Sequence, residues 1–281
     1  KSKKGKTNLL RIVNVNFQSI KTKQSQLYNL LDSTKPDVIF GTETWLDSSI
    51  KDNEIFPPGY NIYRNDRNLN GGGVLIAVKD TLISSAVPEL HTDCEIVWCK
   101  LELVGHKAIY LNSYYNPKTN NAESYNQFEI SINRASSIKN AFIISAGDFN
   151  QPGWDWKMKR LKPKTQNINI HHQFTEILDD YGLTQIVEEP TRGHNTLDLI
   201  LTNYPESFRR VKVIPGISDH DIVYTEVNSK PAKLHQKPRQ IALYKKANWE
   251  NLKQDLIKLQ EEIQTQYNEE ADAETMWTKF V

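Results

Sequence analysis

Short β-rich runs recur along most of this chain, and many of them end on a polar residue. Their Val, Ile, Leu, Tyr and Phe content favours strands, and turn-forming residues separate them. Helical patterns lie between some runs, at 23–33, 123–137 and 170–181, and Gly182 follows the last of these at the position of a helix C-cap. The mixture predicts an α+β fold. Its expected strands are LLRIVNVN (9–16), DVIFGT (37–42), GVLIAV (73–78), EIVWCKLELV (95–104), KAIYLNSYY (107–115), AFIISAG (141–147), TLDLILTN (196–203), RRVKVIPG (209–216) and DIVYTEV (221–227).

Composition limits the class of protein. A chain of 281 residues with 38% hydrophobic residues can bury one large core, which excludes a wholly disordered chain. The net charge of only +1 excludes a globally basic nucleic-acid binder, so any polyanion site must be local. No signal peptide and no apolar run near the ~20 residues of a membrane span is visible. We therefore expect a soluble protein without membrane contact.

Two local patterns have competing interpretations. The glycines at 71–73 lie in RNDRNLNGGGVLIAV (64–78) next to a predicted strand, which favours a hairpin turn over a phosphate-binding loop. Cys94 and Cys99 lie in CEIVWC, where the alternation of apolar residues predicts a strand with one buried face. Inert thiols in a reducing compartment are therefore favoured over a disulfide or a metal pair.

The chain divides into three predicted parts. Residues 1–7 (KSKKGKT) form a flexible basic arm, and 8–228 form the compact domain. Residues 229–281 begin with a basic, proline-containing linker and continue as an amphipathic helix with Asn248 as its N-cap. The apolar face of this helix packs either on the preceding domain or on a following one. Because the chain begins at Lys1 rather than at methionine, we expect it to be a piece of a longer polypeptide.

Polar residues with catalytic chemistry follow or interrupt several of the β-rich runs. Each one alone is more often a turn residue that bonds to its own backbone. Together they can converge on one pocket, because neighbouring strands deliver their ends to a common rim. The residues are Asn16, Glu43, Tyr115, Asp148, Asn150, Asp198, Asp219 and His220.

These residues occur in motifs that resemble a known family. The series Asn16-Phe17-Gln18-Ser19, ETWL, YNP, GDFN and SDH resembles the endonuclease/exonuclease/phosphatase superfamily, which includes the apurinic/apyrimidinic endonucleases and pancreatic DNase. Four segments are most similar to the endonuclease domain of LINE-type non-LTR retrotransposons: KPDVIFGTETWL, DRNLNGGGVLIAV, GDFNQPGWDW and PTRGHNTLDLILTN. The resemblance runs from Leu9 to Val227. Asn14 is a competing alignment for Asn16 in the first motif.

The resemblance implies a four-layer α/β/β/α sandwich with two packed mixed β-sheets, followed by a C-terminal helical extension. It also implies chemistry. Asp148 would orient and deprotonate a water molecule, and Asn150 would donate its amide to a phosphoryl oxygen. Glu43 would supply a hard oxygen ligand to Mg²⁺, for which Mn²⁺ could substitute, with Asn16 and Asp219 assisting.

The remaining roles concern the phosphate. His220 would face the scissile phosphate as a donor, Asp198 would set the tautomer of its ring, and Tyr115 would add a phenolic donor. His171 and His172 have no partner at zinc spacing, so we expect surface or partly buried imidazoles and no zinc site.

Contacts with double-stranded DNA are expected around this rim. The basic segment KMKRLKPK (157–164) either contacts the DNA backbone or is a solvated loop, and packing is favoured over base stacking for Trp156. The loop TRGHNTL (191–197) is short, which predicts loose target specificity governed by DNA deformability. The expected contact residues are Arg64, Lys157, Arg160, Thr191 and Arg192.

The favoured interpretation is a Mg²⁺-dependent endonuclease, monomeric as an isolated domain. It would nick DNA in the nucleus and leave a 3′-hydroxyl for a downstream reverse transcriptase domain of the same polypeptide during target-primed reverse transcription. Two alternatives stay open: a phosphatase or phosphodiesterase of the same superfamily, and a catalytically inactive DNA-binding module.

Overall fold

The computed structural model describes residues 9–105, 108–229, 231 and 247–266. The basic arm expected at 1–7 and most of the linker expected after 229 lie outside the described residues. The first of two six-stranded sheets has the strand order β13-β14-β1-β2-β4-β3, and only β1 and β2 are parallel in it. Its strands are β1 (Leu9–Asn16), β2 (Val38–Thr42), β3 (Tyr60–Asn65), β4 (Val74–Lys79), β13 (Phe208–Ile214) and β14 (Ile222–Asn228).

The second sheet has the order β11-β12-β8-β7-β6-β5, with β7 and β8 parallel. A separate two-stranded ribbon of β9 (Trp154–Asp155) and β10 (Arg160–Leu161) follows the end of β8. The strands of the second sheet are β5 (Ser84–Ala86), β6 (Glu95–Glu102), β7 (Ala108–Tyr115), β8 (Phe142–Asp148), β11 (Thr184–Gln185) and β12 (Asp198–Thr202).

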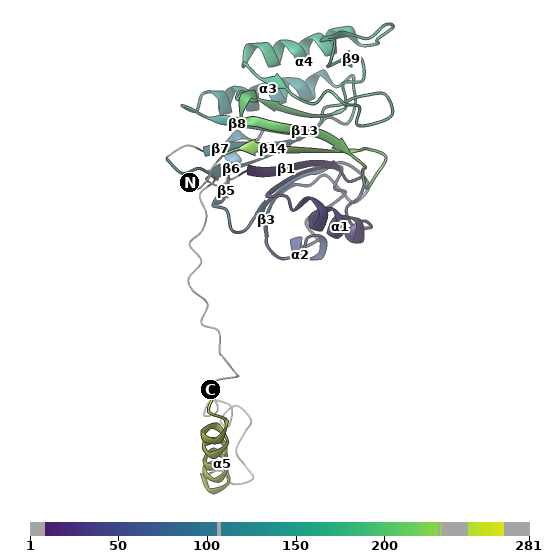
Figure 1. Ribbon diagram of the computed structural model, residues 1–281. Helices are drawn as coiled ribbons and strands as arrows, with labels where there is room; N and C mark the ends of the chain where they lie inside the picture. Colours follow the sequence, from purple (N-terminus) through teal and green to yellow (C-terminus); the bar gives the residue numbers. More distant parts are fainter. Residues whose placement is uncertain (1–8, 106–107, 230, 232–246, 267–281) are drawn as a thin grey trace, which may run out of the picture. The chain divides into compact units, whose positions relative to one another are not determined.

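Helices cover the outer face of each sheet. Figure 1 shows α1 (Gln24–Thr34) and the short α2 (Asp52–Ile55) beneath the first sheet, with α3 (Ala122–Ser136) and α4 (Ile168–Asp180) above the second. Single 3₁₀ turns occur at Pro88–Leu90 and Pro205–Ser207. The elements therefore form the four-layer α/β/β/α sandwich with two mixed sheets that the resemblance implied, and the predicted α+β class is confirmed.

Three apolar clusters separate these four layers. The central cluster lies between the sheets and includes Phe40 and Ile144, both without exposed surface. A second cluster joins α3 and α4 to the second sheet, with Phe128 and Phe174 in a tilted ring contact. The third cluster packs α1 against the first sheet. Strands such as β2 and β8 are thus buried on both faces, which explains their continuous apolar sequences.

The predicted helices and strands correspond closely to those observed. Gly182 has a φ of 60° after α4, and Leu183 N donates to Leu178 O, so the helix ends as expected. The hairpin predicted for the glycine-rich segment is confirmed, since β3 and β4 pair on either side of it. β3 was not among the predicted runs, because YNIYRN mixes polar and apolar residues on a strand with no fully buried face.

The C-terminal helix α5 (Trp249–Gln266) belongs to a second unit, which comprises residues 235–281. Asn251 N donates to Asn248 Oδ1 at 3.1 Å, which confirms Asn248 as the N-cap. No helix in the described parts of the chain combines the length and apolar character needed to cross a bilayer.

Candidate active site

One rim of the sandwich collects the polar strand ends. Asn16, Tyr115 and Asp148 are the last residues of β1, β7 and β8, and Glu43 directly follows β2. Asp198 begins β12, which is antiparallel to β8, so it lies directly opposite Asp148. His220 precedes β14, which is antiparallel to β1. All six residues therefore lie at the same edge of the two sheets.

The innermost part of this rim is a cluster of Asp148, Asp198 and His220. Each contributes one potential ligand atom, and these atoms lie within 4.8 Å of one another. All three side chains are at least 97% buried, with 2%, 0% and 3% exposed surface. His220 Nδ1 lies 2.8 Å from Asp198 Oδ2. The two residues are 22 positions apart in the sequence, so only the pairing of the strands brings them together.

Two amides hold the Asp148 carboxylate. Asn16 Nδ2 donates to Asp148 Oδ2 at 3.1 Å, and the backbone N–H of Asn150 donates to Asp148 Oδ1 at 3.1 Å. Burial raises the pKa of Asp148 well above its usual range, and the neighbouring Asp198 charge raises it further, while His220 opposes both. A proton on this carboxyl is therefore stabilised, as a general base that accepts a proton requires.

The pKa of His220 moves in the opposite direction from that of an isolated buried imidazole. Burial is the largest influence and lowers its pKa, but the hydrogen bond and charge of Asp198, with the charge of Asp148, outweigh burial, so the pKa is raised. If Asp198 accepts from Nδ1–H, the Nε2 edge remains for another partner. The pair can therefore present a charged donor at the rim.

Glu43 occupies the neighbouring part of the rim. Tyr115 Oη donates to its Oε1 at 2.5 Å, and Trp45 Nε1 donates to its Oε2 at 2.9 Å. Glu43 and Trp45 both have left-handed backbones, with φ of 51° and 56°. Such conformations cost about 1–3 kcal/mol each when the residue is not glycine. Surrounding structure must therefore impose this loop geometry.

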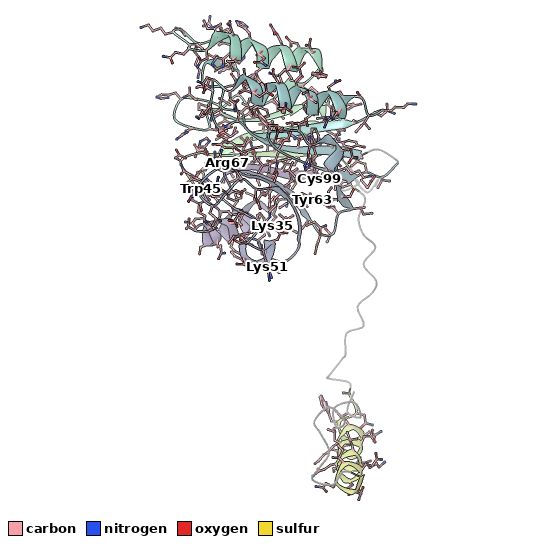
Figure 2. All side chains as sticks on the ribbon, turned by 180° about the vertical axis from the view of Figure 1, so that it is seen from behind. Lys35, Trp45, Lys51, Tyr63, Arg67 and Cys99 are labelled. Atoms are coloured by element: carbon pink, nitrogen blue, oxygen red, sulfur yellow. The ribbon has the colours of Figure 1, made fainter. Side chains whose placement is uncertain are left out.

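The glycine-rich turn imposes it. Trp45 N donates to Gly72 O at 2.9 Å, and Thr44 N donates to Gly73 O at 3.3 Å. Arg67 holds the far side of the turn, because its Nε donates to Gly71 O at 3.0 Å. Figure 2 shows Trp45 and Arg67 on the same side of the molecule. The segment interpreted as a hairpin is thus also the support of the Glu43 loop.

The GDFN motif depends on its glycine. Gly147 has a φ of 146°, and a Cβ built there would lie 1.9 Å from Tyr114 O, so no larger residue fits. Asn150 follows with a φ of 54°, and its Nδ2 donates to Asn116 O at 3.0 Å. This bond uses one amide hydrogen and leaves the second for a ligand.

Asp219 lies apart from the buried cluster. Its Oδ2 is 2.5 Å from the guanidinium of Arg192, and both side chains are about half exposed. Thr191, in contrast, is 1% exposed, and its Oγ1 accepts from the backbone N–H groups of Leu197 and Asp198 at 3.0 and 3.1 Å. Thr191 is thus placed to position Asp198 rather than to face DNA directly.

The other expected DNA contacts differ in exposure. Lys157 and Arg160 are exposed on the ribbon of β9 and β10. Arg64 is only 17% exposed, and its guanidinium is bound by the carboxylates of Asp52 and Asp66 at 3.4 Å each. A DNA contact by Arg64 would have to compete with these partners.

Several residues that sequence reasoning did not assign also build the rim. Ser218 Oγ donates to Asn16 O at 2.6 Å and accepts from His220 N at 3.2 Å, so it ties the two strand ends together. Its place at the start of SDH was a usable signal. Asn14 lies between the sheets, where its Nδ2 donates to Gly147 O at 3.2 Å. Of the two competing asparagines, Asn16 is therefore the one at the rim.

Three further expectations are resolved by packing. Cys94 and Cys99 are free thiols, and burial raises the pKa of Cys94 to about 12, which makes it inert. Trp156 packs against the cluster beneath α4, with its ring centroid 6.1 Å from that of Phe174. His171 is more buried than expected, with 1% exposed surface.

The donor set fits a hard divalent cation. The rim offers carboxylate oxygens from Glu43 and Asp148 and the amide oxygen of Asn16, the ligand types that Mg²⁺ prefers. Asp198 Oδ1 is fully buried and has no hydrogen-bond partner among the described residues. An orphaned carboxylate oxygen beside a second buried carboxylate leaves negative charge that a cation would compensate.

Comparisons with known proteins agree with this geometry. The family model described as Endonuclease/Exonuclease/phosphatase family matches residues 13–220. The sequence has no match among curated proteins.

Among solved structures, the endonuclease domain of TRAS1, a telomere-specific non-LTR retrotransposon, is similar with a TM-score of 0.61 and 18% identity over 78% of this chain and 98% of that one. The AP endonuclease LMAP from Leishmania major has a TM-score of 0.65 and 15% identity over 78% and 88%. The 3′ phosphatase NExo from Neisseria, bound to a product DNA hairpin, has a TM-score of 0.59 and 18% identity over 78% and 99%. At these identities the likeness concerns the fold.

Proposed function

The chain belongs to the endonuclease/exonuclease/phosphatase family, and from that membership we propose that it is a Mg²⁺-dependent endonuclease that nicks double-stranded DNA. The observation that carries the proposal is the buried Asp148, Asp198 and His220 cluster, set among Asn16, Glu43 and the other strand ends of one rim. Family and cluster together support hydrolysis of a phosphate ester as the reaction class.

In the proposed reaction, a water oxygen attacks phosphorus and its proton passes to Asp148. The bond between phosphorus and the 3′ oxygen breaks, which leaves a 5′-phosphate, and the departing oxygen takes a proton from solvent water to become a 3′-hydroxyl. Asn16 and the Asn150 N–H keep the Asp148 carboxylate oriented toward the water. His220, fixed by Asp198, donates from Nε2 to a phosphoryl oxygen, and the free amide hydrogen of Asn150 donates to another.

Glu43, with Asn16, would hold the cation, and Asp219 would assist once released from Arg192. A bound Mg²⁺ supplies charge stabilisation to the phosphoryl group and to the leaving oxygen. The hydrogen bonds from Tyr115 and Trp45 keep both Glu43 oxygens pointed in fixed directions.

The finer proposal is that the 3′-hydroxyl primes a reverse transcriptase that follows in the same polypeptide, with the DNA substrate in the nucleus. Support comes from the ETWL and LDLI motifs, and from the segment YKKANWENLKQDL, which resembles the segment that joins such an endonuclease domain to its reverse transcriptase. DNA as the substrate class is supported by the Neisseria neighbour, which was solved with a DNA hairpin. Fold likeness alone does not distinguish nicking from phosphatase action, since an AP endonuclease and a 3′ phosphatase share it.

Supercoiled plasmid tests the proposal directly. We expect Mg²⁺ to support relaxation of the plasmid and EDTA to abolish it, while the Asp148→Asn variant, purified in parallel, controls for contaminating nucleases. Primer extension from the nicks by an added polymerase should succeed without phosphatase treatment, because the ends carry 3′-hydroxyls. A panel of inositol phosphates and 3′-phosphorylated oligonucleotides tests the phosphatase alternative, which faster turnover of any of these than of plasmid would favour.

A further inference from the structure

The buried side chain of Tyr125 contacts the backbone of the GDFN motif. Tyr125 lies in α3 and has no exposed surface, and its Oη donates to Phe149 O at 2.5 Å. Phe149 stands between Asp148 and Asn150 in the sequence, within the segment 148–151 that we call the catalytic loop. A residue of the outer helical layer therefore reaches the loop from which two of the proposed catalytic side chains project.

The short connection from β7 to α3 places Tyr125 at this point. β7 ends at Tyr115 on the rim, and only residues 116–121 separate it from the helix. Asn121 caps α3, because its side chain accepts from Ser124 N at 3.2 Å, and this bond fixes the first turn. Burial raises the pKa of Tyr125, so its O–H remains a donor at neutral pH.

Phe149 is itself anchored beneath the helices. Its ring has no exposed surface, and its centroid lies 5.0 Å from that of Tyr114 and 5.2 Å from that of Phe174. Its backbone N–H donates to Leu197 O at 2.9 Å. The carbonyl of Phe149 is thus held in the apolar layer, where an unpaired oxygen would be costly and where Tyr125 supplies its partner.

The carbonyl that Tyr125 binds belongs to the same peptide unit as the N–H that holds the Asp148 carboxylate. Phe149 O and the N–H of Asn150 point in opposite directions, because they lie on either side of a planar trans peptide bond. The oxygen accepts from Tyr125, and the N–H donates to Asp148 Oδ1 at 3.1 Å. A rotation of this peptide would break both hydrogen bonds together.

The bond from Asn150 N–H to Asp148 is also a local turn of a kind that aspartates form without support. Here the turn includes a left-handed residue, since Asn150 has a φ of 54°, a conformation that is uncommon outside glycine. The hydrogen bond from Tyr125 adds a tertiary constraint to this local geometry. The turn is therefore held in one orientation rather than sampled among several.

Gln151 sets the direction of the Tyr125 hydroxyl. Its side chain is 1% exposed, its Nε2 donates to Tyr125 Oη at 2.5 Å, and its Oε1 bonds to His171 Nδ1. Because an amide nitrogen can only donate, the hydroxyl oxygen accepts from Gln151 and keeps its own hydrogen for Phe149 O.

We propose that Tyr125 is a positioning residue of the reaction, whose hydroxyl holds the peptide between Phe149 and Asn150 so that Asp148 keeps the orientation that attack on the phosphate requires. This inference rests on the proposed function and deepens it. Tyr125 acts through the loop backbone and does not touch the substrate.

Tyr125→Phe removes only the hydroxyl and tests this role. In single-turnover nicking of a duplex in Mg²⁺, the maximal rate constant should fall about tenfold to thirtyfold, because the base is misoriented. The DNA concentration at half-maximal rate and the affinity for duplex in EDTA should both stay within about twofold of wild type. In ¹⁵N-labelled protein in EDTA, the Asn150 amide should exchange with solvent about tenfold faster than in wild type.

Tyr114→Phe is the matched control. Tyr114 is a second fully buried tyrosine of the same cluster, but its Oη bonds to Ser124 Oγ at 2.7 Å rather than to the catalytic loop. Its loss should lower the melting temperature about as much as loss of the Tyr125 hydroxyl, since each removes one buried hydrogen bond. The nicking rate and the exchange of the Asn150 amide should remain those of wild type.

Gln151→Glu is a second variant that leaves Tyr125 in place and conserves side-chain shape. The introduced carboxylate still accepts from His171, but it replaces the donor to Tyr125 with an acceptor. The hydroxyl should then donate to the carboxylate and release Phe149 O. We expect slower nicking and faster exchange of the Asn150 amide, as for Tyr125→Phe, and unchanged affinity for duplex in EDTA within about threefold.

Wild-type exchange of the Asn150 amide in folded Tyr125→Phe would overturn the proposal, and so would an equal loss of nicking in Tyr114→Phe. Faster exchange with an undiminished nicking rate would also overturn it, because the loosened peptide would then not matter to the reaction. The proposed function is judged separately, by nicking with the wild-type protein, and the exchange measurement does not depend on that activity.

Discussion

Two buried histidines differ in the residue to which Nδ1 bonds. His220 Nδ1 bonds to the carboxylate of Asp198, and His171 Nδ1 bonds to the amide oxygen of Gln151. Both rings are at least 97% buried. The pKa of His220 is raised because Asp198 and Asp148 together outweigh burial, whereas the pKa of His171 is lowered, first by burial and then by the charges of His172 and Lys162. A carboxylate partner makes a charged donor, and an amide partner makes a neutral ring.

The difference shows why burial alone does not identify a catalytic histidine. Both histidines are buried and both bond to another side chain, so exposure and hydrogen bonding do not distinguish them. Only His220 lies within reach of a second carboxylate, Asp148, so its proton can take part in the chemistry of the rim. His171 instead bonds to Gln151, whose amide also donates to Tyr125 beside the catalytic motif.

Removal of the Asp148 carboxylate should have the largest effect. Asp148→Asn keeps the shape of the side chain but removes the base, so nicking should fall at least ~100-fold. Because the folded-state pKa of Asp148 is raised, its ionised form costs stability above the ordinary Asp pKa. The variant should therefore have a higher melting temperature than wild type in EDTA at neutral pH, and this gain should vanish in acid. Unchanged nicking by the folded variant would refute the assigned role.

The Asp198 and His220 pair should lose activity as one unit. Either Asp198→Asn or His220→Gln alone should reduce nicking about 100-fold, and the double variant should be little worse than the poorer single variant. His171→Gln supplies the contrast, since loss of a neutral ring outside the cluster should change the rate by only a few fold. Rates are measured beside melting temperatures for all four variants. Additive losses of nicking activity in well-folded variants would show that Asp198 and His220 act independently.

The smallest expected effect concerns pH and stability. The folded-state pKa of His171 is lowered below its unfolded value, so its neutral ring favours folding above about pH 6.5 and this contribution is lost as pH falls toward the folded pKa. His171→Gln should gain about 2–4 °C in melting temperature relative to wild type between about pH 7.5 and pH 5. For His220, whose pKa is raised, the contribution is present in acid and lost as pH rises through the folded pKa. As pH falls, the melting temperature relative to wild type should therefore rise for His171→Gln and drop for His220→Gln, measured in one pH series in EDTA. Parallel curves for the two variants would contradict the contrast between the histidines.

The chain sequence by itself determined the alternation of elements and the residues at the rim. Fully buried strands such as β2 and β8 and the capped end of α4 are local patterns, which explains why their positions could be predicted to within a few residues. β3 escaped prediction because YNIYRN mixes polar and apolar residues and none of its residues is fully buried. The position of Asp148 and Asn150 at the end of a buried strand could also be predicted, because the apolar run before them is a local pattern.

Only the tertiary structure decided which partner each of these residues has. Asn16 meets Asp148 across 132 positions of sequence, and the register between β8 and β12 sets Asp198 opposite Asp148. The burial of Thr191, the pairing of Asp219 with Arg192 and the different partners of the two histidines likewise follow from strand register and loop packing. Hydrogen bonds act over about 3 Å, so residues distant in sequence acquire their chemistry only when the sheets pair and bring them within that range.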